Sequence, residues 1–257
     1  MLRDTKIGGF SLLALVLLLW EILARAEMVA AVSFPPFSEV FVTFWRLTFT
    51  GTMVLLLLPS LKRLLIGYLL AFGLGVGLGI LMGYFRTAYN FLEPITEVLR
   101  PIPSPAYIPI AILFFGLGDE MKIFMIAFAS FFPILLNTYS GVRSVDLIQI
   151  NTARTFGLGA GAILRKVIIP AASPQILTGM RISVAVSLIL VVISEMVASV
   201  DGIGYYILSA QRSFRVREMY AGVLTLGLLG YFLNWLFLKF ENSVIHWHLE
   251  AMKREQL

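Results

Sequence analysis

Long runs without a charged side chain dominate this chain of 257 residues, and they constrain its fold more than any other feature. A helix needs roughly 20 apolar residues to cross the hydrocarbon of a membrane. Hydrophobic residues make up 59% of the chain and charged residues 14%, a balance that leaves no material for a large aqueous domain. The uncharged runs cover Ile7 to Trp20, Leu64 to Phe85, Pro101 to Gly118, Ile123 to Val142, Ile182 to Ser194 and Ala221 to Leu238.

These runs predict an all-α membrane protein, with residues 1–257 forming a single transmembrane domain of about six helices. A further uncharged stretch, 47–61, is shorter and ends near Pro59. We interpret it as an interfacial or loop helix, and counting it as a span would give seven. The six predicted spans cover about 7–23, 64–85, 92–115, 122–142, 176–197 and 219–240.

A polar, glycine-bearing segment from Asn151 to Pro170 interrupts the apolar runs. Its first six residues predict about a turn and a half of helix, Gly157 loosens the backbone after it, and Pro170 is expected to stop the helical run that comes next. A helix as short as the first one is not stable by itself in water. The segment therefore either packs on the membrane helices of this chain or is received by another protein.

With Ala153, Gly157, Val167, Ile169 and Pro170 at their present spacing, this segment resembles the cytoplasmic "EAA" loop of ABC importer permeases. In that loop a Glu-Ala-Ala triplet, a glycine four residues after the last alanine, and an Ile-x-Leu-Pro end recur at the same spacing. Asn151 and Thr152 stand where the family has its glutamate and first alanine. The matching residues are Ala153, Gly157, Val167, Ile169 and Pro170.

The resemblance covers nearly the whole chain after residue 30, through segments 34–40, 99–103, 132–138 and 176–182. It is to the branch that imports nitrate, sulfonates, taurine, bicarbonate and pyrimidine precursors. It implies a type I ABC importer permease fold, and a permease subunit that forms the translocation path for a small solute, expected to be an anion.

Basic residues flank the two sides of the predicted spans almost equally, so the orientation in the membrane is taken from the resemblance. It places both termini and a coupling loop of about 143–175 in the cytoplasm of a bacterial cell, beneath its inner membrane.

Partners are also implied by the resemblance: a second permease copy in a homodimer, two ATP-binding cassette ATPase subunits and an extracytoplasmic solute-binding protein. The ATPase subunits would bind ATP and magnesium, and this chain would hold no cofactor. Membrane lipid is expected around the spans, and basic residues that meet anionic lipid explain the net charge of +5 without nucleic acid. The residues implied in ATPase coupling are Asn151, Thr152, Ala153, Arg154, Gly157 and Pro170.

The third predicted span is unusual because it is rich in proline, which deletes a backbone donor and frees a carbonyl one turn earlier. Free carbonyls are not tolerated in hydrocarbon. We therefore expect this segment either to be shielded by protein or to line an aqueous cavity. Arg100, Pro101 and Pro103 are therefore candidates for the translocation path, with Arg100 offering a charge to an anion. The alternative is that Arg100 pairs with Glu97 or Glu93 on the same helix face.

Three polar residues of later spans are further path candidates. Ser130 and Asn137 lie near a kink expected at Pro133, although either one would equally serve to hydrogen-bond a neighbouring helix. Glu195 is an ionisable residue near the outer end of the fifth span. Buried carboxylates in membranes are usually paired, and we consider Arg181 or a residue of another span as its partner.

Small residues recur every four positions in the second span, at Ala71, Gly75, Gly79 and Gly83. This spacing places them on one helix face and predicts close packing against another helix. The alternative is a flexible gating helix.

Catalytic motifs do not occur in the sequence, which favours a non-catalytic subunit whose partner hydrolyses ATP. There is no Gly-x-x-x-x-Gly-Lys-Ser/Thr segment, no Ser/His/Asp set and no HExxH helix. The chain has no cysteine, and His246 and His248 have no third ligand nearby, so we predict no metal site. The competing class is an ion-coupled secondary transporter or channel. Such proteins carry corresponding broken helices in two halves, whereas only one span here is rich in proline.

Overall fold

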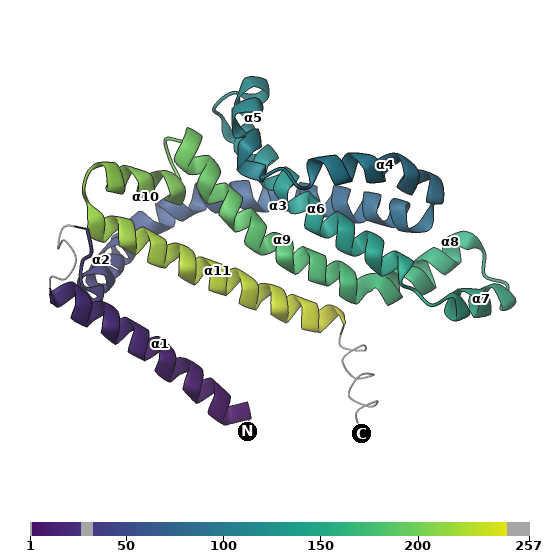
Figure 1. The fold of residues 1–257 in the computed structure, drawn as a ribbon, viewed down its shortest axis with the longest axis horizontal. Coiled ribbons are helices and arrows are strands. Elements are labelled where there is room, and N and C mark those ends of the chain that lie inside the picture. Colours follow the sequence, from purple (N-terminus) through teal and green to yellow (C-terminus); the bar gives the residue numbers. More distant parts are fainter. Residues whose placement is uncertain (1, 27–32, 246–257) are drawn as a thin grey trace. The chain divides into compact units, whose positions relative to one another are not determined.

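The computed structural model describes residues 2–26 and 33–245, and all regular structure in these ranges is helical. Element η1 is a 3-10 helix and element η2 is a π-helix. The elements shown in Figure 1 are α1 (Leu2–Arg25), α2 (Phe37–Phe49), α3 (Thr52–Tyr84), α4 (Arg86–Leu99), η1 (Ser104–Tyr107), α5 (Ile108–Phe115), α6 (Asp119–Arg143), α7 (Leu147–Thr155), α8 (Ala160–Ile163), η2 (Leu164–Ile168), α9 (Ile169–Ala198), α10 (Ile203–Arg212) and α11 (Val216–Val244).

Four helices in the described ranges are long and apolar enough to cross a membrane: α3, α6, α11 and the continuous helix Ala160–Ala198. A fifth is reached if α4 and the η1–α5 segment are counted together, although these bend by 91° at the break between them. Helix α1 has 24 residues and covers the first predicted span. The chain is therefore a multi-pass helical membrane protein.

The stretch 47–61 does not form a separate helix, so that prediction is wrong. Its first residues complete α2, and Gly51 then turns the chain with a φ of +76°. The rest begins α3, a single helix of 33 residues that runs through Pro59. Proline removes one hydrogen bond, and the leucines before it favour helix strongly enough to continue past that loss.

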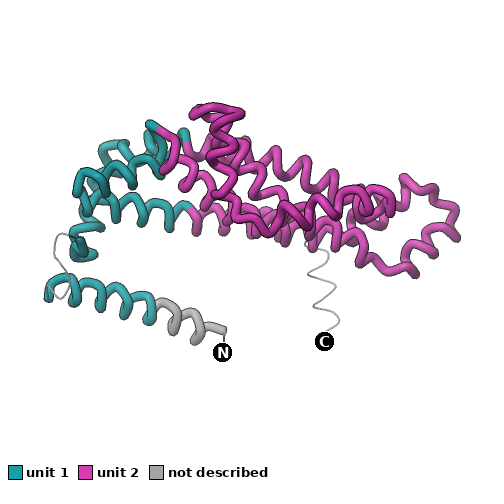
Figure 2. Tube along the Cα trace, turned by 45° about the horizontal axis from the view of Figure 1, so that its top comes forward, with its two compact units in different colours: residues 1–59, 200–229 teal, residues 60–199, 230–257 magenta. Residues whose placement is uncertain are grey.

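The chain divides into two compact units, coloured separately in Figure 2. One unit comprises residues 1–59 and 200–229, and the other comprises residues 60–199 and 230–257. Helices α3 and α11 each contribute residues to both units.

The second unit is built on α6, which packs closely against α3. A Cβ added to Gly79 would lie 2.6 Å from Cβ of Thr138, and one added to Gly83 would lie 2.6 Å from Cβ of Val142. These glycines let the α3 backbone rest directly on α6, as the four-residue spacing predicted. Close packing, rather than flexibility, explains this face.

Helix α9 lies beside α6 along the same unit (Figure 1). A Cβ on Gly179 of α9 would lie 2.6 Å from Cβ of Asn137, and one on Gly141 of α6 would lie 2.8 Å from Cβ of Gln175. Each helix thus supplies a glycine at a crossing point with the other. The buried apolar core around these contacts includes Ile134, Val142, Ala153, Ile163, Ile168, Ala172 and Leu177.

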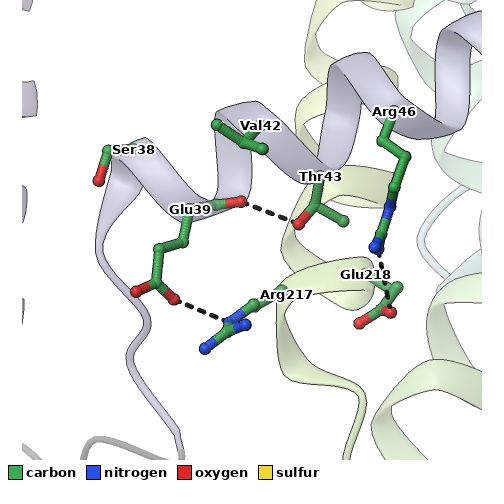
Figure 3. Close-up of a pocket in the computed structure, with 7 residues that line it drawn as sticks. All are labelled: Ser38, Glu39, Val42, Thr43, Arg46, Arg217 and Glu218. Carbon is green, nitrogen blue, oxygen red and sulfur yellow. Dashed lines mark hydrogen bonds and ion pairs between the residues drawn. The ribbon is translucent and has the colours of Figure 1, made fainter.

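In the first unit α2 is tied to the start of α11 by two ion pairs (Figure 3). Arg217 Nε lies 2.8 Å from Glu39 Oε2, and Arg46 Nη2 lies 3.6 Å from Glu218 Oε1. These side chains line a cavity of about 430 Å³. Next to Glu39, at the N-terminal end of α2, the helix is also held by α1, because Glu21 accepts hydrogen bonds from the backbone N and the hydroxyl of Ser38. The charged face of α2 thus joins two other helices of this unit.

Candidate functional site

The polar loop after α6 folds into α7, which is longer than the sequence predicted. It begins at Leu147, where Asp146 caps the N-terminus by accepting a hydrogen bond from the Ile148 backbone N at 2.8 Å. An aspartate N-cap satisfies one of the free donors of the first turn. Nine residues therefore form about two and a half turns.

Gly157 ends α7 in a conformation that favours glycine. Its φ is +76°, its N–H donates to the Arg154 carbonyl at 2.9 Å, and the next N–H, of Leu158, donates to the Ala153 carbonyl at 3.1 Å. These two bonds are the Schellman arrangement, in which the residue after the C-cap is left-handed. Leu158 and Ala153 also pack in the same core cluster. The glycine of the loop motif is thus explained by backbone geometry.

Pro170 does not end a helix, contrary to the sequence prediction. The chain from Ala160 continues through α8, η2 and α9 without interruption, and Pro170 lies in the first turn of α9. The turn just before it is π-helical, with the Ile169 N–H donating to the Leu164 carbonyl. A proline ring clashes with the carbonyl four residues earlier, and a π-bulge widens the backbone at that point. The loop is therefore joined to a long membrane helix by continuous backbone.

The predicted coupling residues divide into a buried and an exposed set. Ala153 is 7% exposed and holds α7 to the core, whereas Asn151, Thr152 and Arg154 are exposed. Asn151 Oδ1 accepts a 3.4 Å hydrogen bond from Arg154 Nη1. Asn151 and Thr152, which stand where the resembled loop has Glu and Ala, therefore both lie on the surface of α7.

Large apolar side chains also lie on the surface of this loop. Phe156 is 80% exposed, and Leu147 and Ile148 are 71% exposed. Beside them is an open groove of about 730 Å³ that is bounded by both halves of the loop. Its lining residues are Ile148, Gln149, Thr152, Ala153, Phe156, Leu158, Lys166, Val167, Pro170 and Ala171. The exposed apolar side chains and the groove together form a surface suited to receiving another protein.

The third predicted span is broken rather than straight. After α4 the chain passes through Pro101 and Pro103 and turns, so that η1 and α5 run at 91° to α4. Proline disfavours helix in the residue before it, which accounts for the break. Arg100 lies at the end of α4, where its Nη2 is 3.5 Å from Glu97 Oε2. The predicted alternative, an ion pair within the same helix, is the arrangement in the structure.

Ser130 and Asn137 lie on α6 but in different surroundings. Ser130 is fully buried against Ser183 of α9. The Ser183 hydroxyl donates a hydrogen bond to the Ser130 carbonyl at 2.6 Å. Asn137 is partly exposed, donates to the Pro133 carbonyl at 2.8 Å and accepts from Gln175 Nε2 at 3.3 Å. The structure thus favours helix contact for Ser130 and leaves Asn137 near a polar surface.

Glu195 is paired with Arg63, a residue that the sequence did not single out as its partner. Glu195 Oε1 lies 2.8 Å from Arg63 Nη1, and its Oε2 accepts from the Ser60 hydroxyl at 2.9 Å. Arg63 also donates from Nε to Asp119 Oδ1 at 2.7 Å. The partner considered from sequence, Arg181, instead contacts Asn234. Arg63 and Glu195 are 132 residues apart, and no local pattern connects them.

In the described ranges no group of three or more potential metal ligands comes together. His246 and His248 lie outside the described residues.

Comparisons with known proteins agree on one family. Residues 75–246 match the family described as binding-protein-dependent transport system inner membrane component. The chain belongs to this family. A putative ABC transporter permease of Methanocaldococcus jannaschii is 39% identical to this permease, covering 87% of this chain and 85% of the relative. The putative aliphatic sulfonates transport permease SsuC of Bacillus subtilis is 31% identical, covering 93% and 87% respectively.

The permease also resembles a solved structure of the MetNI methionine ABC transporter in an inward-facing conformation. The TM-score is 0.64 at 18% identity, with 77% of this chain and 98% of that chain covered. At this identity the likeness concerns the fold alone. The fold of this chain is that of a type I ABC importer permease, as the sequence resemblance implied.

Proposed function

We propose that this permease imports a small anion, and that α7 receives the motion of a partner ATPase. The observation that carries the proposal is the Schellman turn at Gly157 followed by the continuous backbone from Ala160 to Ala198. A displacement of α7 would pass through this short turn into a helix long enough to cross the membrane. Arg154, Lys166 and the exposed apolar side chains would supply the docking contact.

Two ATPase subunits, a solute-binding protein and a second permease copy complete the proposed machine, with the loop and both termini in the cytoplasm. ATP and magnesium would be held by the ATPase subunits. The second copy is proposed from the resemblance to ABC importer permeases, to whose family the chain belongs.

A sulfonate or a comparable small anion is the proposed solute class, supported by the relationship to the aliphatic sulfonates permease. The binding protein would do much of the selecting. A thermal-shift screen of the cognate binding protein against alkanesulfonates, taurine, nitrate, bicarbonate and pyrimidine precursors tests this class. Stabilisation only by neutral or cationic solutes would reject it.

Coupling is tested by a pair of glycine substitutions in the reconstituted transporter. Gly157→Trp places a side chain at a φ of +76°, where L residues are strained, although no atom lies within 4 Å of the added Cβ. Gly161→Trp is the matched control, because it lies in the same loop, has equally open surroundings and needs no left-handed backbone. We expect G157W alone to lose ATP-driven uptake or ATPase association. Equal transport by the two variants would reject the role of α7.

An ion-coupled carrier or channel is the alternative, and one measurement separates it. Proteoliposomes that contain only this chain should show no uptake driven by an ion gradient. Uptake by the chain alone, unaffected by ATP, would overturn the importer proposal.

A further inference from the structure

Arg181 lies on an exposed face of α9, which belongs to one of the helices long and apolar enough to cross a membrane. Two other polar residues share this face one and two turns before it, Thr178 and Gln175, and all three are exposed. Residues three or four apart lie on one side of a helix. We call Gln175, Thr178 and Arg181 the polar stripe.

Neighbouring helices add amides to both ends of the stripe. Gln175 Nε2 donates to Asn137 Oδ1 of α6 at 3.3 Å, and Arg181 Nε donates to Asn234 Oδ1 of α11 at 3.3 Å. In the described part of the chain no carboxylate lies within ion-pair distance of Arg181. Among the described residues, the printed partner of its guanidinium is the neutral amide of Asn234.

The length of α9 puts this charge at membrane depth. The part of the continuous helix Ala160–Ala198 that follows Arg181, residues 182–198, rises about 26 Å, which is less than the roughly 30 Å of hydrocarbon. A crossing by this helix therefore includes Arg181, because a crossing that ended before it would have to include both Arg165 and Lys166. Glu195 is fully buried and paired with Arg63, so its charge is shielded by protein. Arg181 is exposed, and an exposed arginine at this depth must face water or a partner rather than lipid.

We propose that the polar stripe is a wall of the translocation path, and that Arg181 is its contact for the transported anion. This proposal rests on the proposed import of an anion and assigns the solute contact to a residue. A positive charge beside Thr178, Gln175 and the amides of Asn137 and Asn234 would replace part of the hydration shell of a small anion. An arginine without a carboxylate partner keeps its full attraction for such a solute. Of the path candidates named from the sequence, only Asn137 belongs to this surface.

Because the chain has no cysteine, single cysteines can map this face directly. The substitution Thr178→Cys is made in the full-length transporter. Membrane vesicles that contain this variant are then treated with water-soluble thiosulfonate reagents, one anionic and one cationic. Leu69→Cys on α3 is the control, because Leu69 is also exposed but lies on an apolar face. We expect rapid labelling at position 178 and slow labelling at position 69.

The charge of Arg181 is tested in the same background. We expect the anionic reagent to react faster than the cationic one with T178C, and R181Q to lower this ratio by roughly tenfold, because a unit charge one turn away shifts the two rates in opposite directions. R181K should keep the ratio. The cationic reagent serves as an internal check on folding, since a misfolded variant would gain reactivity with both.

Two results would overturn the proposal. If T178C and Q175C are as unreactive as L69C, the stripe is covered by lipid or by a second copy and is no path. If R181Q leaves the reagent ratio unchanged, Arg181 does not set the charge preference of this face. Neither result depends on ATP-driven uptake, so failure here is distinguishable from failure of the proposed import function.

Discussion

Arg63 of α3 and Glu195 of α9 form an ion pair of 2.8 Å in which both side chains are nearly inaccessible, at 3% and 0% exposure. Asp119, at the first turn of α6, accepts from the same guanidinium. One cluster thus joins the interior of α3 to the start of α6 and the end of α9. Lys122 also belongs to the cluster, because its Nζ lies 3.9 Å from Asp119 Oδ1. Such a site stabilises only while every member is present.

Removing one member of the cluster should be costly. E195A is predicted to lower the free energy of unfolding by about 3–5 kcal/mol, because it leaves the Arg63 charge buried without one of its partners. The measurement is thermal unfolding of the purified permease in detergent. E97A is the control, since Glu97 pairs with Arg100 on an exposed surface, and its loss should cost less than about 1 kcal/mol. Equal effects of E195A and E97A would contradict this account.

Gly79 and Gly77 provide a second matched pair on α3. A Cβ at position 79 would lie 2.6 Å from Thr138, whereas one at position 77 meets no atom within 4 Å. G79A should therefore lower the free energy of unfolding by about 1–3 kcal/mol, because the added methyl group overpacks the contact between α3 and α6. G77A should leave the free energy of unfolding unchanged or raise it slightly. Unfolding temperatures of the two variants give the comparison. A tolerated G79A would mean that α3 and α6 can separate without loss.

Phe214 occupies the position at the end of α10 that Gly157 occupies at the end of α7. Its φ is +55°, and the N–H groups of Phe214 and Arg215 donate to the Gln211 and Ala210 carbonyls in the same Schellman pattern. Phe214 is 80% exposed, so packing offers little compensation for the strain. F214G is expected to raise stability by about 1 kcal/mol, and F214A should not. A destabilising F214G would indicate that the ring itself contributes contacts.

The N-cap of α7 can be tested without touching the exposed docking surface. D146A removes the acceptor for the Ile148 N–H and should lower the free energy of local opening of the first turn of α7 by about 1 kcal/mol. D146N retains an acceptor and should lower it less. Hydrogen exchange of the first turn of α7 measures this effect. Unchanged protection in D146A would show that packing of Ala153, rather than the cap, holds the helix.

Several elements could be predicted because their cause is local. Apolar runs set the helices, and a four-residue glycine period set the α3 face that packs on α6. The end of α7 near Gly157 was predicted, whereas the left-handed conformation of this glycine was found only in the structure. The continuation of α9 through Pro170 could not be predicted, because it depends on a π-helical turn that relieves the proline clash. The prolines after Arg100 indicated that the helix would be irregular there. They did not predict the 91° angle between α4 and the η1–α5 segment.

The sequence by itself determined that this chain is a helical membrane permease, since hydrophobicity and the loop motif are both encoded over short distances. Only the tertiary structure decided which charges are paired. Arg63 and Glu195 meet because α3 and α9 both pack on α6, and Arg181 is left exposed because α9 turns that face away from the packed core. Charge pairing depends on which helix faces meet, and that choice is made by packing among segments far apart in the chain.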